Sequence, residues 1–142
     1  MKQSTMLILF AGLMLTSCSD VMIEDHLEGT WELKTYLRND VDETMMIYIA
    51  DYEETYQLDG TFTRSYIAGD QESVNETGEF SINEENSTIH ISDVSSISEF
   101  SEAHSTLSTS TINVEVIDES EYAYSFENGG DKHEFRFIRK AE

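Results

Sequence analysis

Aromatic side chains at alternate positions are the residues of this sequence best suited to binding chemistry. They recur with a period of two along several short segments, so they can line one face of a sheet. Small-molecule sites are usually apolar walls with a few polar groups that orient the ligand, and phenol hydroxyls can be those groups. The pattern predicts either a hydrophobic ligand pocket or a packed core, built from Tyr52, Tyr56, Phe62, Tyr66, Phe80, Tyr122, Tyr124 and Phe126.

Arg64 is a charged residue within this aromatic pattern. It falls between Phe62 and Tyr66 on the same strand face. If that face points inward, the guanidinium would anchor an anionic ligand group through charge-assisted hydrogen bonds. If it points outward, Arg64 is a surface charge.

Residues that would support catalysis or metal binding are not grouped in the sequence. The four histidines are far apart, and none has another histidine or a cysteine at metal-ligand spacing. The nucleophile motif GxSxG is absent. Acidic pairs such as Glu53–Glu54 and Glu84–Glu85 alternate faces or sit in turns, so most are expected to be solvated. The sequence therefore predicts no enzyme, no metal and no cofactor.

Short strands must position the aromatic residues. Proline is absent, and repeated runs of alternating apolar and polar residues favour strands over helices. The pair Asp59–Gly60 between runs 52–58 and 61–67 predicts a tight hairpin, since both turn positions need positive φ. The pattern indicates an all-β, antiparallel up-and-down meander that closes into a barrel of about eight strands. The remaining strands are expected at 30–37, 78–82, 87–92, 109–117, 120–126 and 132–138.

The pattern of the first run assigns its strand faces, whereas two later segments are irregular. In the first run, Trp31, Leu33 and Leu37 are expected on one strand face and Tyr36 on the other. Residues 41–50 show helical spacing but contain a β-prone MIYI, so helix and strand are both open. The serine-rich segment 92–105 is expected to be an irregular strand followed by a loop.

The first residues are typical of an exported protein. Lys2 precedes a short apolar run, Met6 to Leu15, which indicates a secretory signal and not a membrane-spanning helix. The following LTSC resembles the bacterial lipobox, which implies cleavage before Cys18, the only cysteine, and lipidation of that residue. Ser19 then favours the outer membrane. We expect a signal peptide at 1–17, a tether at 18–27 and one domain at 28–142.

The charge of the chain limits its partners. Removal of residues 1–17 takes away Lys2 and no acidic residue, which leaves seven basic and 29 acidic side chains and a formal charge of −22 with neutral histidines. A surface this acidic repels phosphate backbones, so nucleic acid is excluded as a partner. With Cys18 lipidated, no thiol is left for a disulfide, and the fold must depend on its own core.

The segments LEGTWEL, Leu27–Leu33, and DGTF, Asp59–Phe62, resemble the lipocalin and fatty-acid-binding superfamily, in particular the lipocalin-like domains of bacterial lipoproteins. The resemblance implies a lipocalin-like barrel with Trp31 packed inside its closed end. Gly29 would leave room where the chain enters, and Arg139 of the last strand would lie across the indole. Ile138 stands where fatty-acid-binding proteins have a ligand-binding tyrosine, which counts against a fatty-acid carboxylate bound in that way.

Two functions fit these observations. The first is a non-catalytic, membrane-anchored envelope protein that binds a small hydrophobic or amphipathic ligand in the barrel. The second is an interaction or inhibitor module for a protein partner, with a barrel filled by its own side chains. A continuous interior pocket of about 300 Å³ or more would favour the first, and a solid core the second.

Overall fold

Nine strands, one short α-helix and a 3-10 turn make up the described part of the chain. The computed structural model describes residues 22–46, 50–67, 73–96 and 111–141. Neither helical segment in these ranges is long and apolar enough to span a membrane. The elements in chain order are α1 (Ile23–Leu27), β1 (Gly29–Arg38), β2 (Val41–Asp42), η1 (Thr44–Met46), β3 (Ala50–Tyr56), β4 (Thr61–Ile67), β5 (Ser73–Asn83), β6 (Thr88–Ser96), β7 (Thr111–Ile117), β8 (Glu121–Asn128) and β9 (Asp131–Arg139).

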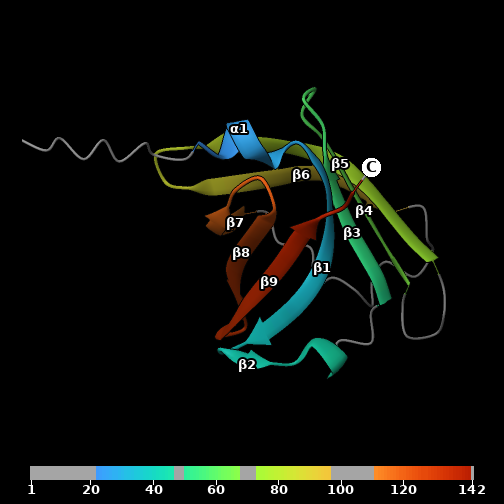
Figure 1. The fold of residues 1–142 in the computed structure, drawn as a ribbon, viewed down its shortest axis with the longest axis vertical. Coiled ribbons are helices and arrows are strands. Elements are labelled where there is room, and N and C mark those ends of the chain that lie inside the picture. Colours follow the sequence, from blue (N-terminus) through green and yellow to red (C-terminus); the bar gives the residue numbers. More distant parts are fainter. Residues whose placement is uncertain (1–21, 47–49, 68–72, 97–110, 142) are drawn as a thin grey trace, which may run out of the picture.

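The strands form one antiparallel sheet that closes on itself (Figure 1). Neighbours follow chain order from β3 to β9, and β1 pairs with β3 on one side and with β9 on the other. β2 adds only two residue pairs to the end of β1, so eight strands build the wall. Closure pairs the first long strand with the last and so removes edges that an open sheet would expose. The predicted all-β, lipocalin-like meander barrel of about eight strands is confirmed.

The hairpin predicted at Asp59–Gly60 joins β3 to β4. Gly60 has a φ of 85°, in the left-handed region that glycine enters without strain. The Asp59 carboxylate accepts a hydrogen bond from the Thr61 N–H at 2.9 Å, which fixes the turn. β3 ends at Tyr56, two residues before the end of the predicted run 52–58, and Leu58 is exposed in the turn.

A bulge in β1 changes the face predicted for its second half. Pairing with β9 begins at Trp31, passes over Lys34 and resumes at Thr35. The extra residue turns the following side chains over. Tyr36 is therefore buried, and its ring centroid lies 5.0 Å from that of Phe135. The prediction that Tyr36 points away from the Trp31 face is wrong for this reason.

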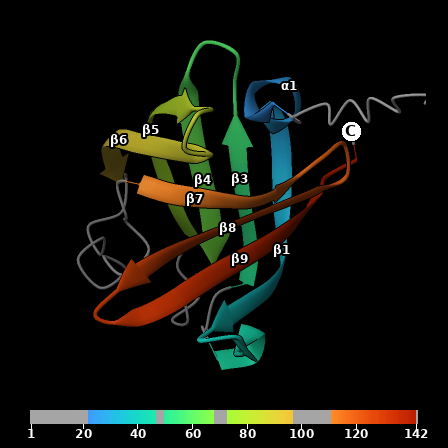
Figure 2. The same ribbon diagram turned by 90° about the vertical axis from the view of Figure 1, so that its left-hand side faces the viewer.

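The barrel has two different ends. Helix α1 covers one of them, which we call the closed end, and its side chains Ile23 and Leu27 are buried in the core. The turns at 57–60, 84–87 and 118–120 lie at this end, whereas β2 and the turn at 129–130 lie at the opposite one, the far end (Figure 2). The segment predicted as a tether therefore finishes in a helix that packs on the barrel.

The segments for which the sequence pattern was weakest are only partly described. Residues 41–50 combine a two-residue strand, β2, with the 3-10 turn η1 before β3 begins at Ala50, and 47–49 lie outside the described residues. The side chains of Val41 and Met45 are 60% and 90% exposed. β6 continues through Ser96, and the remainder of 92–105 lies outside the described ranges, as do the predicted signal peptide and Cys18.

Gly29 is needed where the chain passes from α1 into β1. Its φ is 123°, and a Cβ placed there would lie 2.5 Å from Nη1 of Arg139. We expect Gly29→Ala to lower the free energy of unfolding by about 1 to 3 kcal/mol, because it adds backbone strain and displaces the guanidinium. Urea denaturation measures the loss. Gly129→Ala is the control: its φ is 62° and no atom lies within 4 Å of the added Cβ, so its cost should be smaller. Equal costs would mean that Arg139 tolerates the displacement.

Candidate functional site

The barrel interior holds the aromatic set predicted from the sequence. Seven of its eight members are buried, and Phe80 is half-buried against the same core. Neighbouring rings of the set pack with centroids 5.1 to 6.5 Å apart, within the usual range for aromatic pairs. The structure thus brings residues from β3, β4, β5 and β8 into one cluster.

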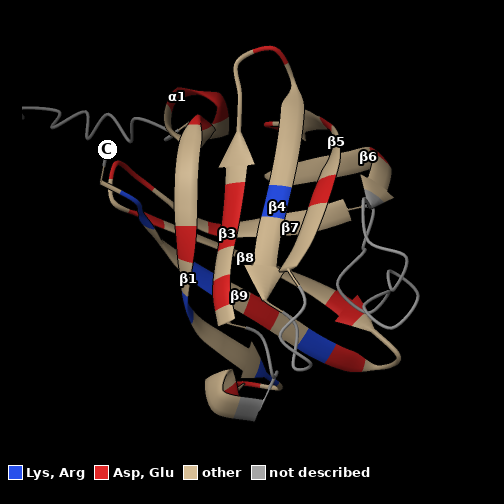
Figure 3. Ribbon diagram, turned by 90° about the vertical axis from the view of Figure 1, so that its right-hand side faces the viewer, with Lys and Arg blue, Asp and Glu red and all other residues tan. Residues whose placement is uncertain are grey.

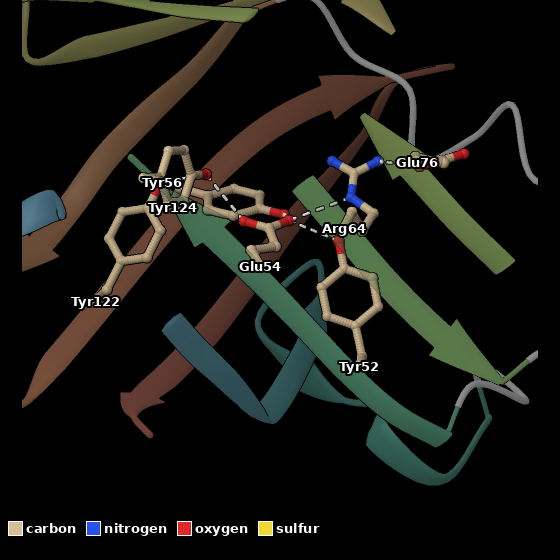
Figure 4. Close-up of polar contacts among 7 residues, drawn as sticks. All are labelled: Tyr52, Glu54, Tyr56, Arg64, Glu76, Tyr122 and Tyr124. Atoms are coloured by element: carbon tan, nitrogen blue, oxygen red, sulfur yellow. Dashed lines mark hydrogen bonds and ion pairs between the residues drawn. The ribbon is translucent and has the colours of Figure 1, made fainter. Parts of the chain in front are cut away.

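Glu54 lies at the centre of the polar contacts inside this cluster (Figure 4). Its side chain is fully buried. Oε1 accepts hydrogen bonds from the hydroxyls of Tyr52 at 2.6 Å and Tyr124 at 2.8 Å, and Oε2 accepts one from Tyr56 at 2.9 Å. The Tyr56 hydroxyl also lies 3.2 Å from that of Tyr122. A buried carboxylate is tolerated when its oxygens are satisfied in this way.

Arg64 points into the barrel and pairs with two carboxylates of the chain itself. Its Nε lies 3.3 Å from Oε1 of Glu54, and its Nη1 lies 3.1 Å from Oε2 of Glu76. Only 4% of the Arg64 side chain is exposed, and its Cζ lies 5.1 Å from the Phe62 ring centroid. We call the seven residues drawn in Figure 4 the Glu54 cluster: Tyr52, Glu54, Tyr56, Arg64, Glu76, Tyr122 and Tyr124.

The charge balance of the Glu54 cluster differs from the one expected at an anion site. Arg64 was expected to anchor an anion if it faced inward. It does face inward, but its positive charge is met by two carboxylates from β3 and β5. An incoming anionic ligand would therefore meet two negative groups beside one positive group, which disfavours it.

Glu54 and Glu76 are the site residues that sequence reasoning missed. The general expectation of solvated acids fails for Glu54, which is buried between two tyrosines. The signal was present in the sequence, because Glu54 shares a strand face with Tyr52 and Tyr56. Glu76 gave a weaker signal, and only the pairing of β4 with β5 places it directly opposite Arg64.

The buried tyrosines should resist ionisation. Burial raises the pKa of Tyr52, Tyr56, Tyr122 and Tyr124 well above the ordinary value, and raises that of Tyr66 to about 12. The unfolded chain releases these protons near pH 10 and the folded barrel retains them. The free energy of unfolding is thus expected to fall as the pH rises above about 10, and to be independent of these groups below it. Tyrosinate absorbance should rise together with loss of near-ultraviolet circular dichroism. Ionisation of these tyrosines in an intact barrel would show that their hydroxyls are not buried as the structure places them.

Trp31 occupies the closed end of the barrel. Its side chain is fully buried, and its ring centroid lies 5.4 Å from that of Tyr122. The indole Nε1–H donates a hydrogen bond of 2.9 Å to the carbonyl of Leu27, the last residue of α1. The tryptophan therefore joins the helix to the core.

Arg139 crosses the outer side of this indole, with its Cζ 4.2 Å from the ring centroid. Its guanidinium donates to three backbone carbonyls, those of His26 and Glu28 at 2.6 Å and that of Glu119 at 2.7 Å. Two of these carbonyls belong to the end of α1 and the chain that follows it, where helical hydrogen bonds run out. Trp31, Gly29 and Arg139 thus form one structural unit at the closed end.

Three hollows border the barrel wall, and none of them includes the Glu54 cluster; the smallest, of about 250 Å³, lies against α1, the turn at 57–60 and β5. One of about 890 Å³ at the closed end is lined by residues that include Gly29, Thr55 and Arg139. Another of about 290 Å³ crosses β3, β4 and β5 near the far end. Over the described ranges, no group of three or more His, Cys, Asp or Glu side chains is arranged to hold a metal ion.

Comparisons with known proteins add evidence on the fold. No protein family model and no curated protein matches the sequence. A crystal structure of a lipocalin-like protein from Bacteroides uniformis is similar, with a TM-score of 0.57 and 20% identity over 81% of this chain and 98% of that one. A DUF4847 family protein from Bacteroides vulgatus is similar at a TM-score of 0.53 and 16% identity, over 84% of this chain and 99% of that one. At these identities the likeness establishes the lipocalin-like barrel and not an activity.

Proposed function

We propose that this chain, with its lipocalin-like barrel, is a non-catalytic, lipid-anchored protein of the bacterial envelope that binds a small amphipathic molecule inside the barrel. The observation that carries the proposal is the Glu54 cluster. A barrel that needed only a core would be at least as stable with apolar side chains in place of a buried ion pair. Ligand sites, by contrast, combine aromatic walls with a few polar groups. Departures from an apolar core are also commonest at functional sites.

The ligand that best fits the Glu54 cluster is uncharged or cationic. Arg64 is already paired with Glu54 and Glu76, so a ligand carboxylate would have to displace one of them. Carboxylate oxygens and phenol hydroxyls can accept hydrogen bonds from a hydroxyl, amide or ammonium group. The proposed ligand therefore has an apolar body and a hydrogen-bond donor, and it is not a fatty acid held through Arg64.

The membrane anchor rests on the sequence. LTSC follows a short apolar run at the spacing of a lipobox, and Cys18 is the only cysteine. Several acyl chains on that residue give a stable anchor, whereas a single chain is marginal. Ser19 in the next position supports transfer to the outer membrane.

A second function is favoured by the packing of the rings. The described interior residues are buried against one another, as in a barrel filled by its own side chains. Such a barrel would act as an interaction or inhibitor module, with its acidic surface or a loop offered to a protein partner.

Ligand binding can be tested on residues 19–142, which lack the lipidated cysteine and the signal peptide, exported in the native host behind an ordinary cleavable signal and purified without detergent. Mass spectrometry of the organic extract should recover a small amphipathic compound in stoichiometric amount. Titration calorimetry with decanol, decylammonium and decanoate as probes should then give the weakest binding for decanoate, because the cluster holds two carboxylates.

A matched pair of variants relates such binding to the interior. Val74 is buried on β5 beside Tyr66, whereas the next residue, Asn75, is exposed. Val74→Trp should reduce binding of decanol and Asn75→Trp should not, with circular dichroism to verify that both fold. An extract without bound compound, together with no binding of any probe, would refute ligand binding and favour the interaction module. Separately, labelled palmitate should be incorporated into the full chain and not into Cys18→Ala, and no incorporation into either would refute the lipid anchor.

A further inference from the structure

The closed end of the barrel holds the beginning of the described chain in place. The carboxylate of Glu84, in the turn between β5 and β6, accepts hydrogen bonds from the N–H groups of Ile23 at 3.0 Å and Glu24 at 2.9 Å. Trp31 and Arg139 bind backbone carbonyls at the other end of α1. The helix is thus attached at both of its ends, and no part of the chain from Ile23 onward can lengthen a tether without breaking these contacts.

The free tether between the proposed anchor and the barrel is consequently short. Only four residue steps separate Cys18 from Met22. A fully extended chain covers at most about 3.6 Å per residue, so the tether reaches roughly 14 Å. Strands of 7 to 11 residues, tilted as barrel strands are, give a barrel roughly 25 Å long. The tether is too short to bring the far end of the barrel against the lipid while the closed end points away.

We infer that the closed end of the barrel faces the membrane at short range and that the far end points away from it. This inference rests on the proposed lipid anchor at Cys18. It means that a ligand or protein partner reaches the far end from the aqueous phase, and not directly from the bilayer. The surface that meets the lipid is α1 together with the turns at 57–60, 84–87 and 118–120.

The charge of this surface determines how it meets the lipid. Its exposed side chains are mainly acidic, so the surface has no basic patch with which to bind anionic headgroups. Burying so many carboxylates in a bilayer would be unfavourable. The barrel is therefore held beside the membrane by its tether and does not insert. The exposed acidic residues at this end are Glu24, Asp25, Glu28, Asp59, Glu85, Asp118, Glu119 and Glu121.

Two matched Glu→Cys variants of the lipidated full chain test the orientation. Glu85 is exposed in a closed-end turn, and Glu127 is exposed near the far end of β8. Because the Cys18 thiol carries lipid, each variant offers one free thiol for a nitroxide label. The labelled proteins are reconstituted in phosphatidylcholine vesicles that contain a nickel-chelating lipid, and paramagnetic relaxation of the nitroxide is measured. The relaxation enhancement should be severalfold larger for Glu85→Cys than for Glu127→Cys.

The possible results distinguish a wrong orientation of the barrel from the absence of a lipid anchor. Equal enhancements, or a larger one for Glu127→Cys, would overturn the orientation although the protein is anchored. Failure of both variants to float with vesicles would overturn the anchor and the orientation together. Residues 19–142 of each variant, which lack both the lipidated cysteine and the signal peptide, should show no enhancement after labelling. If the enhancement persists, the barrel itself binds lipid and the tether does not set its orientation.

Discussion

Replacing Glu54 by alanine is expected to lower the free energy of unfolding by about 3 to 5 kcal/mol, enough to unfold a marginal domain. The substitution removes the acceptor of three tyrosine hydroxyls, those of Tyr52, Tyr56 and Tyr124. It also leaves the buried Arg64 guanidinium with one fewer carboxylate. Unsatisfied buried hydroxyls and an under-compensated buried charge both carry large desolvation costs. Urea denaturation, followed by far-ultraviolet circular dichroism, measures the change.

Two further variants show whether the charge and the burial of Glu54 cause this loss. Glu54→Gln keeps an oxygen acceptor and nearly the same volume, so it should cost less than Glu54→Ala. Glu53→Ala is the matched control, because Glu53 is the adjacent acid on the outer face and forms an ion pair with the exposed Lys140. Surface pairs of this kind contribute about 1 kcal/mol or less. If Glu54→Ala costs no more than Glu53→Ala, the buried network has no role in stability.

Replacing Arg139 by methionine is expected to cost about 2 to 4 kcal/mol. The side chain makes three charge-assisted hydrogen bonds to backbone carbonyls, and it also stacks on Trp31. Hydrogen bonds to charged groups and cation–π contacts each contribute on the order of 1 to 3 kcal/mol, with some loss to solvent at a partly exposed site. Arg139→Lys should recover only part of the loss, because an ammonium lacks the planar fork that reaches several carbonyls.

The single tryptophan gives this prediction a direct signal. Trp31 is the only indole in the chain, so its emission reports the closed end specifically. Arg139→Met should shift the denaturation midpoint and move the Trp31 emission toward longer wavelength as α1 loosens. Arg136→Met is the control on the same strand, because the Arg136 side chain is exposed and its buried partner Glu134 keeps a second ion pair, with Lys132. Identical effects of the two variants would show that Arg139 does not hold the closed end.

The buried charges also limit what the barrel can bind. The aromatic rings of the interior would suit an apolar ligand, but two carboxylates and one guanidinium lie among its tyrosines (Figure 4). Along the ribbon, the basic segment of β4 lies between acidic segments of β3 and β5 (Figure 3). The expected weak binding of decanoate relative to decanol follows from that balance. A result in the opposite direction would mean that Glu76, the less deeply buried partner, gives way to an incoming carboxylate.

The sequence by itself determined the class of fold and the position of most strands. Alternation of apolar and polar residues specifies strands, and Asp59–Gly60 specifies a hairpin, because both are local properties of the chain. Every predicted run overlaps an observed strand. The resemblance also implied that Arg139 of the last strand lies across Trp31 of the first, and the structure pairs the two residues directly.

Only the tertiary structure decided which charges face inward and what they meet. The bulge at Lys34 brings Tyr36 into the core because a slip of one residue inverts the faces of a strand. Pairing of β4 with β3 and β5 brings Arg64 to Glu54 and Glu76. The tyrosines that bond to Glu54 come from β3 and β8, which are far apart in the sequence. Such contacts depend on barrel closure and on strand register. Local sequence patterns carry neither, so they identified the aromatic wall but not the ion network inside it.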